Sequence, residues 1–268
     1  MIPGQRPMDV TEMRPAVEVT DLVHQYGALN IITKTSLRLT EGEFVSIVGP
    51  SGCGKTTLLN IIAGLTPCQV GKVQILGTPP KEGRPDIAYM LARDSLLPWK
   101  TAADNAQFGG KIRRMDAAER RARAEHLLES VGLGSFGNRY PKELSHGMRQ
   151  RVALARTFCL GSPLLLMDEP FGALDAQTKL QLEEVLLKLW SEERRTVIFV
   201  THDLSEAIAL SDRVIVMRAR PGAIIADIPI NLARPRSVRQ LQKSHEYHDL
   251  YAKLWSSLEQ ALETVDDV

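Results

Sequence analysis

A glycine-rich run at residues 49–57 combines residue types that can hold phosphate groups. Glycines let successive backbone N–H groups point into one concave nest, and the N-terminus of a following helix adds partial positive charge. Lys55 can reach the outer phosphates of a nucleotide, and the Thr56 hydroxyl can coordinate Mg²⁺. The spacing G-x-x-x-x-G-K-[ST] therefore predicts a P-loop. Its residues are Gly49, Pro50, Ser51, Gly52, Cys53, Gly54, Lys55, Thr56 and Thr57.

Two adjacent carboxylates, Asp168 and Glu169, directly follow the apolar run at residues 164–167. In a chain with a P-loop this is the Walker B arrangement. It predicts that Asp168 holds Mg²⁺, directly or through water, and that Glu169 acts as general base on the attacking water. The alternative role is an acidic turn after a buried strand.

The elements around these residues predict an α/β fold with a mainly parallel sheet. Residues 44–48 are continuously apolar and end at the glycine-rich run, as expected for a strand that is buried on both faces. Strands alternating with helices favour a parallel sheet. Further strands are expected at residues 17–19, 36–39, 164–167, 197–201 and 214–217, and helices at residues 58–65, 117–131, 174–194 and 241–262.

Composition excludes several classes of protein. The chain has 268 residues, and its 33 basic and 32 acidic side chains give a formal net charge of +1, which argues against a general nucleic-acid binder. The longest uncharged stretch, residues 56–71, is interrupted by glycine and proline and is too short for a membrane span. The N-terminal residues lack the apolar region of a signal peptide, and three widely spaced cysteines form no disulfide framework. A reduced, cytosolic chain is expected.

The order of motifs resembles that of ATP-binding-cassette (ABC) ATPases. The segment LSHGMRQRV at residues 144–152 is similar to the LSGGQ signature of that family. Asp175 ends a segment that resembles the D-loop, and His202 follows a predicted strand at the place of the switch histidine. Tyr26 occupies the place of the aromatic residue that stacks on adenine. With the P-loop and the Walker B carboxylates, the resemblance covers about residues 16–220.

This resemblance implies a fold and a mechanism. The fold would be a RecA-like P-loop NTPase core with an N-terminal antiparallel β subdomain and an inserted α-helical subdomain at about residues 92–154. Members of the family form head-to-tail dimers that sandwich two ATP molecules. Ser145 and Gly147 would touch the γ-phosphate across the homodimer interface, His202 would contact it and orient the water near Glu169, and Asp175 would link the two sites.

The expected organisation of the chain has three parts. Residues 1–15 would be a flexible arm, residues 16–230 the ATPase domain, and residues 231–268 a helical extension. The extension is expected to be either an appended tail or a helix packed on its own domain. Deleting the residues after about Ala233 should leave basal hydrolysis intact if the tail is appended.

Departures from the family pattern at His146 and Ala92 bear on the mechanism. His146 replaces the first glycine of the signature pair. Ala92 stands where the Q-loop of the family has a glutamine that senses Mg²⁺ and relays its state to the helical subdomain. Alanine cannot coordinate a metal, so either Arg93 or Asp94 substitutes for the glutamine or coupling works without that contact.

The segment LLPWKT at residues 96–101 resembles the nitrate, sulfonate and taurine group of bacterial importers, and so does the C-terminal extension. This implies an ATPase subunit that works with a transmembrane permease at the cytoplasmic face of the inner membrane, and indirectly with a periplasmic or lipid-anchored solute-binding protein. Leu96 to Trp99 would either dock the permease or pack the subdomain junction. An exporter subunit and a soluble ATP-switch protein are the alternatives.

Overall fold

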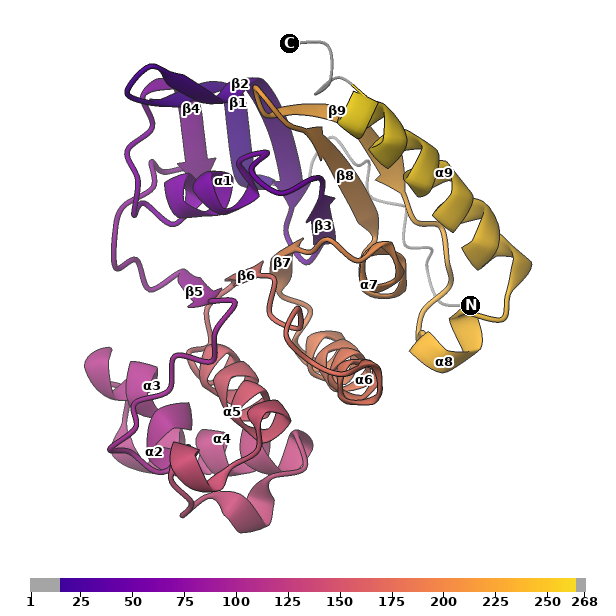
Figure 1. Ribbon diagram of the computed structural model, residues 1–268. Helices are drawn as coiled ribbons and strands as arrows, with labels where there is room; N and C mark the ends of the chain where they lie inside the picture. Colours follow the sequence, from indigo (N-terminus) through magenta and orange to yellow (C-terminus); the bar gives the residue numbers. More distant parts are fainter. Residues whose placement is uncertain (1–14, 264–268) are drawn as a thin grey trace, which may run out of the picture.

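The computed structural model describes residues 15–263 and contains two sheets with helices around them (Figure 1). The smaller sheet is antiparallel, and its strand order is β2-β1-β4. Its strands are β1 (Pro15–Tyr26), β2 (Leu29–Thr40) and β4 (Val70–Ile75). The predicted N-terminal arm, residues 1–15, lies outside the described residues except for Pro15, where β1 begins.

The larger sheet has the strand order β5-β6-β7-β3-β8-β9, in which only β9 runs antiparallel to its neighbour. Every residue of β3, β6 and β7 is buried, which explains why continuous apolar runs predicted these strands closely. The strands are β3 (Phe44–Val48), β5 (Ile87–Met90), β6 (Leu164–Asp168), β7 (Thr196–Val200), β8 (Arg213–Arg218) and β9 (Ala223–Pro229).

One group of helices lies apart from the others. It consists of α2 to α5, lies below the larger sheet and is joined to it through the segment after β5 (Figure 1). The helices are α1 (Lys55–Ile62), α2 (Ala102–Ala106), α3 (Phe108–Ile112), α4 (Ala117–Ser130), α5 (His146–Cys159), α6 (Ala176–Glu193), α7 (Leu204–Leu210), α8 (Val238–Leu241) and α9 (His245–Glu263).

Several elements differ from the sequence expectation. Strands β1 and β2 are each 12 residues long rather than three or four, because they pair along their whole length through irregular registers. No individual strand was expected at β4, β5 or β9 and no individual helix at α2, α3, α7 or α8, although a helical subdomain was expected at about residues 92–154. β9 is an edge strand in which Ile228 alone of its seven residues is buried, and Asp227 and Pro229 interrupt its apolar residues. Helix α7 did carry a signal, since Asp203 caps it and Glu206 follows three residues later.

The C-terminal extension packs on the domain. Helix α9 contacts β8, β9 and α7, and its Tyr247, Leu254 and Ala261 are buried in a cluster with residues of those elements. Arg236, before α8, is 8% exposed and donates hydrogen bonds to five backbone carbonyl oxygens, those of Ile208, Ala209, Ser211, Ile230 and Leu232. The structure thus favours the packed-helix alternative and argues against a dispensable tail.

A substitution in α9 tests this packing. Replacing Leu254, which is fully buried, by alanine should lower the free energy of unfolding by about 2–5 kcal/mol, because it removes buried methyl groups and leaves a cavity. The matched control is Leu262→Ala on the same helix, where the side chain is 49% exposed and the loss should stay below about 0.5 kcal/mol. Chemical denaturation measures both values, and equal effects would contradict the packing.

Candidate functional site

The carboxyl ends of β3, β6 and β7 lie side by side and bring the predicted site residues together. Asp168 at the end of β6 pairs in register with Val200 at the end of β7, and Val200 also pairs with Ile47 of β3. Because parallel strands end at the same edge of a sheet, the loops that follow all three strands meet there. The glycine-rich run follows β3, Glu169 follows β6, and His202 follows β7.

The glycine-rich run packs closely against the neighbouring strand β8. A Cβ atom on Gly49, whose φ is +157°, would lie 2.3 Å from the carbonyl oxygen of Met217 on β8. Helix α1 begins at Lys55, so the last residues of the run enter the N-terminal turn of a helix. Glycine is thus required sterically, and the turn presents backbone N–H groups as an anion nest needs.

Backbone carbonyl groups of the glycine-rich run hold the Lys55 side chain. Its Nζ donates to the carbonyl oxygens of Gly49 at 2.8 Å and Pro50 at 3.1 Å. The Sγ atom of Cys53 lies 3.8 Å from the same ammonium group. Burial raises the pKa of the Cys53 thiol, with Lys55 opposing the shift, and the side chain is fully buried. Cys53 is therefore a packed, protonated thiol rather than an exposed nucleophile.

Thr56 and Asp168 contact each other directly. The Thr56 hydroxyl donates to the Asp168 carboxylate, and its oxygen lies 2.9 Å from Oδ2 and 3.2 Å from Oδ1. Burial raises the pKa of Asp168 above its usual value. One hydroxyl and one carboxylate are the hard oxygen ligands that Mg²⁺ takes when phosphates supply others, so this pair fits a magnesium ion.

Glu169 and His202 form a second pair. Nδ1 of His202 lies 3.2 Å from Oε2 of Glu169, so it donates when the carboxylate is ionised. Glu169 has a left-handed φ of +45°, and its N–H donates to the carbonyl oxygen of Val200. Non-glycine residues take up this backbone region at some cost, typically at functional sites. The side chains are 35% and 58% exposed, which leaves both reachable from solvent.

A hollow of about 280 Å³ lies in front of this edge of the sheet. Glu169 and the glycine-rich run share its wall, so the carboxylate faces the space where a phosphate chain would lie. The lining residues are Ile31, Ser51, Gly52, Gly54, Lys55, Thr56, Thr57 and Glu169.

The signature residues gather elsewhere, at the N-termini of α5 and α6. Ser145 caps α5 by accepting from the N–H of Met148, and Asp175 caps α6 by accepting from the N–H of Thr178. Gly147 packs so closely on α6 that an added Cβ would lie 2.6 Å from Cγ2 of Thr178. Within the described part of the chain, neither Ser145 nor Gly147 belongs to the lining of the phosphate hollow.

Tyr26 ends β1 and is 52% exposed. Its ring packs edge-on against that of His24, with 4.8 Å between the centroids. An aromatic face is therefore available to a planar ligand, although Tyr26 is not among the described residues that line the phosphate hollow.

Sequence reasoning missed the groups that fix the His202 loop. Nζ of Lys179 on α6 forms ion pairs with Asp203 at 3.0 Å and with Glu206 at 2.9 Å, and the Thr201 hydroxyl also bonds to Glu206. Burial raises the pKa of neighbouring Glu183 to about 8, helped by the charge of Glu206. The capping pattern of Asp203 and Glu206 was a local signal, but their pairing with α6 was not.

It also missed Gly222, between β8 and β9. Its N–H donates to the carbonyl oxygen of Ile31, and its own carbonyl accepts from the N–H of Thr33. An added Cβ would lie 2.1 Å from the carbonyl oxygen of Cys53. Gly222 therefore joins β2 to the glycine-rich run, and no spacing in the sequence indicates that contact.

The chain is similar in sequence to known proteins. The family model described as ABC transporter matches residues 32–172. The uncharacterized ABC transporter ATP-binding protein YtlC of Bacillus subtilis is 46% identical over 222 residues, which cover 81% of this chain and 84% of that protein. The taurine import ATP-binding protein TauB of Rhizobium johnstonii is 38% identical over 245 residues, 91% of this chain and 94% of that protein.

A solved structure agrees in fold. It is a dimeric post-hydrolysis state of the ATP-binding cassette MJ0796 bound to ADP and Pi. It is 32% identical, has a TM-score of 0.70, and covers 81% of this chain and 100% of its own. The predicted RecA-like P-loop core is thereby confirmed. The chain belongs to the ABC transporter family, as an ATP-hydrolysing ATP-binding cassette.

Proposed function

We propose that this cassette powers an importer that takes up a small solute of the nitrate, sulfonate and taurine group through a separate permease. The observation that carries the proposal is the 38% identity to a taurine import ATP-binding protein over 91% of the chain. The segment at residues 96–101 supports the same group.

The surface proposed to receive the permease is Trp99, at the end of the segment 96–99. Leu96 is buried, and Leu97 is held by Asn105, which donates to its carbonyl oxygen and accepts from its N–H. Trp99 is 71% exposed. Residues of this segment therefore have different roles. Leu96 packs the subdomain junction, whereas the exposed Trp99 can contact a partner helix.

The proposed hydrolytic site is completed by a second copy of the chain. Ser145 and Gly147 of one subunit would meet the γ-phosphate held by the P-loop of the other, which accords with their place outside the phosphate hollow of their own chain. Asp175 would connect the two sites, and Tyr26 would stack on the adenine. The dimeric state of the MJ0796 cassette supports this assembly.

Within the site each residue has a defined task. Thr56 and Asp168 would hold Mg²⁺, which would supply charge neutralisation between the outer phosphates. Lys55, held at the loop by the Gly49 carbonyl, balances phosphate charge. Glu169 accepts the proton of the attacking water, and His202 orients that water through its contact with Glu169.

The proposed place of action is the cytoplasmic face of the inner membrane, with a periplasmic or lipid-anchored solute-binding protein on the far side. It follows from the importer assignment. Residues 15–263 include no helix with both the length and the apolar character of a membrane span.

Affinity purification tests the proposal. A tagged Glu169→Gln protein is purified with ATP from detergent-solubilised membranes, and the co-purifying chains are identified by mass. We expect a multi-span permease, and we expect the additional substitution Trp99→Ala to reduce its recovery by at least about tenfold, because a buried aromatic anchor carries much of the energy of an interface. Soluble partners alone would contradict the transporter, and a permease that moves its solute outward would identify an exporter.

A further inference from the structure

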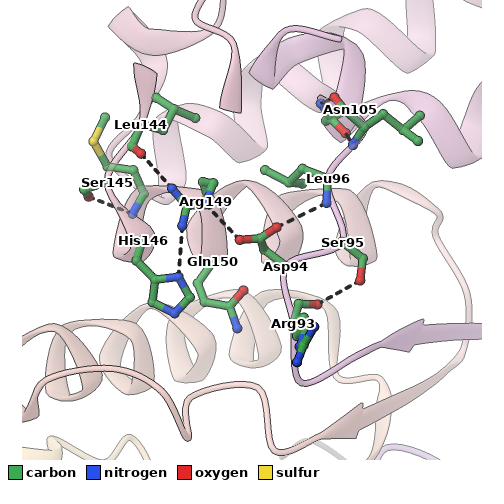
Figure 2. A network of polar contacts seen from close by, with 12 residues as sticks. Arg93, Asp94, Ser95, Leu96, Asn105, Leu144, Ser145, His146, Arg149 and Gln150 are labelled. Atoms are coloured by element: carbon green, nitrogen blue, oxygen red, sulfur yellow. Dashed lines mark hydrogen bonds and ion pairs between the residues drawn. The ribbon is translucent and has the colours of Figure 1, made fainter. Parts of the chain in front are cut away.

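Arg149 on α5 touches both neighbours of the signature serine. Its Nη1 donates to the carbonyl oxygen of Leu144 at 3.0 Å, and its Nη2 lies 3.3 Å from Nδ1 of His146. Ser145, between them, caps the same helix. One guanidinium group thus fixes the backbone before Ser145 and the side chain after it (Figure 2). Its planar fork of five donors makes this double contact possible.

The same guanidinium group also contacts the segment at residues 92–97, in which Ala92 replaces the Q-loop glutamine. Nε of Arg149 forms an ion pair with Oδ2 of Asp94 at 2.9 Å, and Oδ1 of Asp94 accepts from the N–H of Leu96 (Figure 2). The Arg149 and Asp94 side chains are 31% and 20% exposed, so the pair is partly screened by solvent. Asp94 lies two residues after Ala92, which stands at the position of the Q-loop glutamine, and two residues before Leu96, where the LLPWKT segment begins.

The His146 side chain supplies an acceptor for Arg149. Because arginine can only donate, Nδ1 of His146 is the acceptor in this contact. A glycine at this position would offer Arg149 no acceptor. The histidine that replaces the first glycine of the signature pair is therefore part of the Arg149 contact.

Two further contacts bind the same segment to α5. Arg156, two turns after Arg149, donates to the carbonyl oxygens of Asp94 at 2.7 Å and Ser95 at 2.9 Å. Gln150, which is almost fully buried, donates to the carbonyl oxygens of Ala92 and Pro170. Together with Asn105 at Leu97, these bonds fix residues 92–97 firmly to the helices on either side.

We propose that Arg149 is a positioning residue that, with Asp94, couples the segment following Ala92 to the signature serine. The link runs from the segment carrying Trp99 to Ser145 and ends at the signature. In the proposed dimer that signature faces the ATP bound to the other subunit. Permease contact at one subunit would thus act on the partner's nucleotide, and the inference rests on the proposed function.

The first experiment compares substitutions at Arg149 in the full-length protein. Arg149→Gln should lower kcat for ATP about tenfold, equivalent to about 1.4 kcal/mol of barrier. Arg149→Lys keeps a charge for Asp94 but cannot reach all three acceptors, so it should recover only part of the rate. The matched control is Arg151→Gln on the same helix, which contacts Gln181 and Val131 but not the segment, and should keep wild-type turnover.

A second experiment separates the two subunits' sites. In a Glu169→Gln background, Arg149→Gln should leave the affinity of the monomer for nucleotide unchanged, because the P-loop is intact. It should raise about tenfold the ATP concentration that drives dimerisation, measured by size exclusion. The doubly exchanged protein, Asp94→Arg with Arg149→Asp, should recover part of that loss only if the ion pair itself matters.

The outcomes discriminate between the two proposals. If Arg149→Gln weakens nucleotide binding by the monomer, or if Arg151→Gln slows turnover equally, the positioning role is wrong. If Ser145→Ala slows turnover and Arg149→Gln does not, only this inference fails. If Ser145→Ala has no effect, or ATP drives no dimer in the Glu169→Gln protein, the composite site of the proposed function fails instead.

Discussion

The Glu169→Gln protein is expected to bind ATP with wild-type affinity and to hydrolyse it at least about tenfold more slowly, since a positioned general base contributes about 10²–10⁴-fold. The amide keeps the size of the side chain and can still contact His202, but it cannot accept the proton of water. Glu169 lines the phosphate hollow and lies 3.2 Å from His202, so no other change in the site is expected.

Steady-state hydrolysis and titration with a fluorescent nucleotide measure the two quantities separately. The matched control is Glu119→Gln in the first turn of α4, far along the chain from the site, which should keep the wild-type rate. Wild-type turnover in the Glu169→Gln protein would reject Glu169 as the base. Loss of nucleotide affinity would instead show that the carboxylate shapes the P-loop.

The second prediction concerns Gly222→Ala. The new methyl group would lie 2.1 Å from the carbonyl oxygen of Cys53 and 2.7 Å from that of Ile31. Relief of these contacts requires backbone displacement of the glycine-rich run, and a misplacement of about 1 Å at a reacting group can cost about a hundredfold in rate. We expect the affinity for nucleotide to fall at least about tenfold, equivalent to about 1.4 kcal/mol.

Gly137→Ala is the control for Gly222→Ala. Gly137 has an ordinary φ of −54°, and an added Cβ would meet atoms only at 3.7 Å or more. It should therefore leave both nucleotide binding and turnover unchanged. Equal nucleotide affinity in the Gly222→Ala and wild-type proteins would mean that the loop between β8 and β9 yields without moving the P-loop.

The placement of the candidate phosphate site and its carboxylates could be predicted because the motifs are local in the sequence. Gly49 to Thr57 form one run that follows β3 and enters α1, and Asp168 and Glu169 stand at the end of the apolar strand β6. Fully buried parallel strands leave an unmistakable apolar run, so β3, β6 and β7 were expected within a residue or two of their ends. Parallel pairing then brings Glu169 and His202 to one edge.

Elements whose stability depends on neighbours were not predictable. β9 and β4 expose about half of their residues and exist through the strands beside them, so no periodic pattern marks them. The extent of β1 and β2 was underestimated for the same reason, since their pairing includes bulges that interrupt the alternation.

The sequence by itself determined the chemistry of this protein, because a P-loop, Walker B carboxylates and a signature each occupy a few consecutive residues. Only the tertiary structure decided which partners those residues have. It placed Gly222 against Cys53, Arg236 and α9 against the β8 side of the core, and Asp94 beside Arg149. The reason is physical: residues 55 positions apart, such as Asp94 and Arg149, interact only after the chain has packed, and packing depends on the whole core.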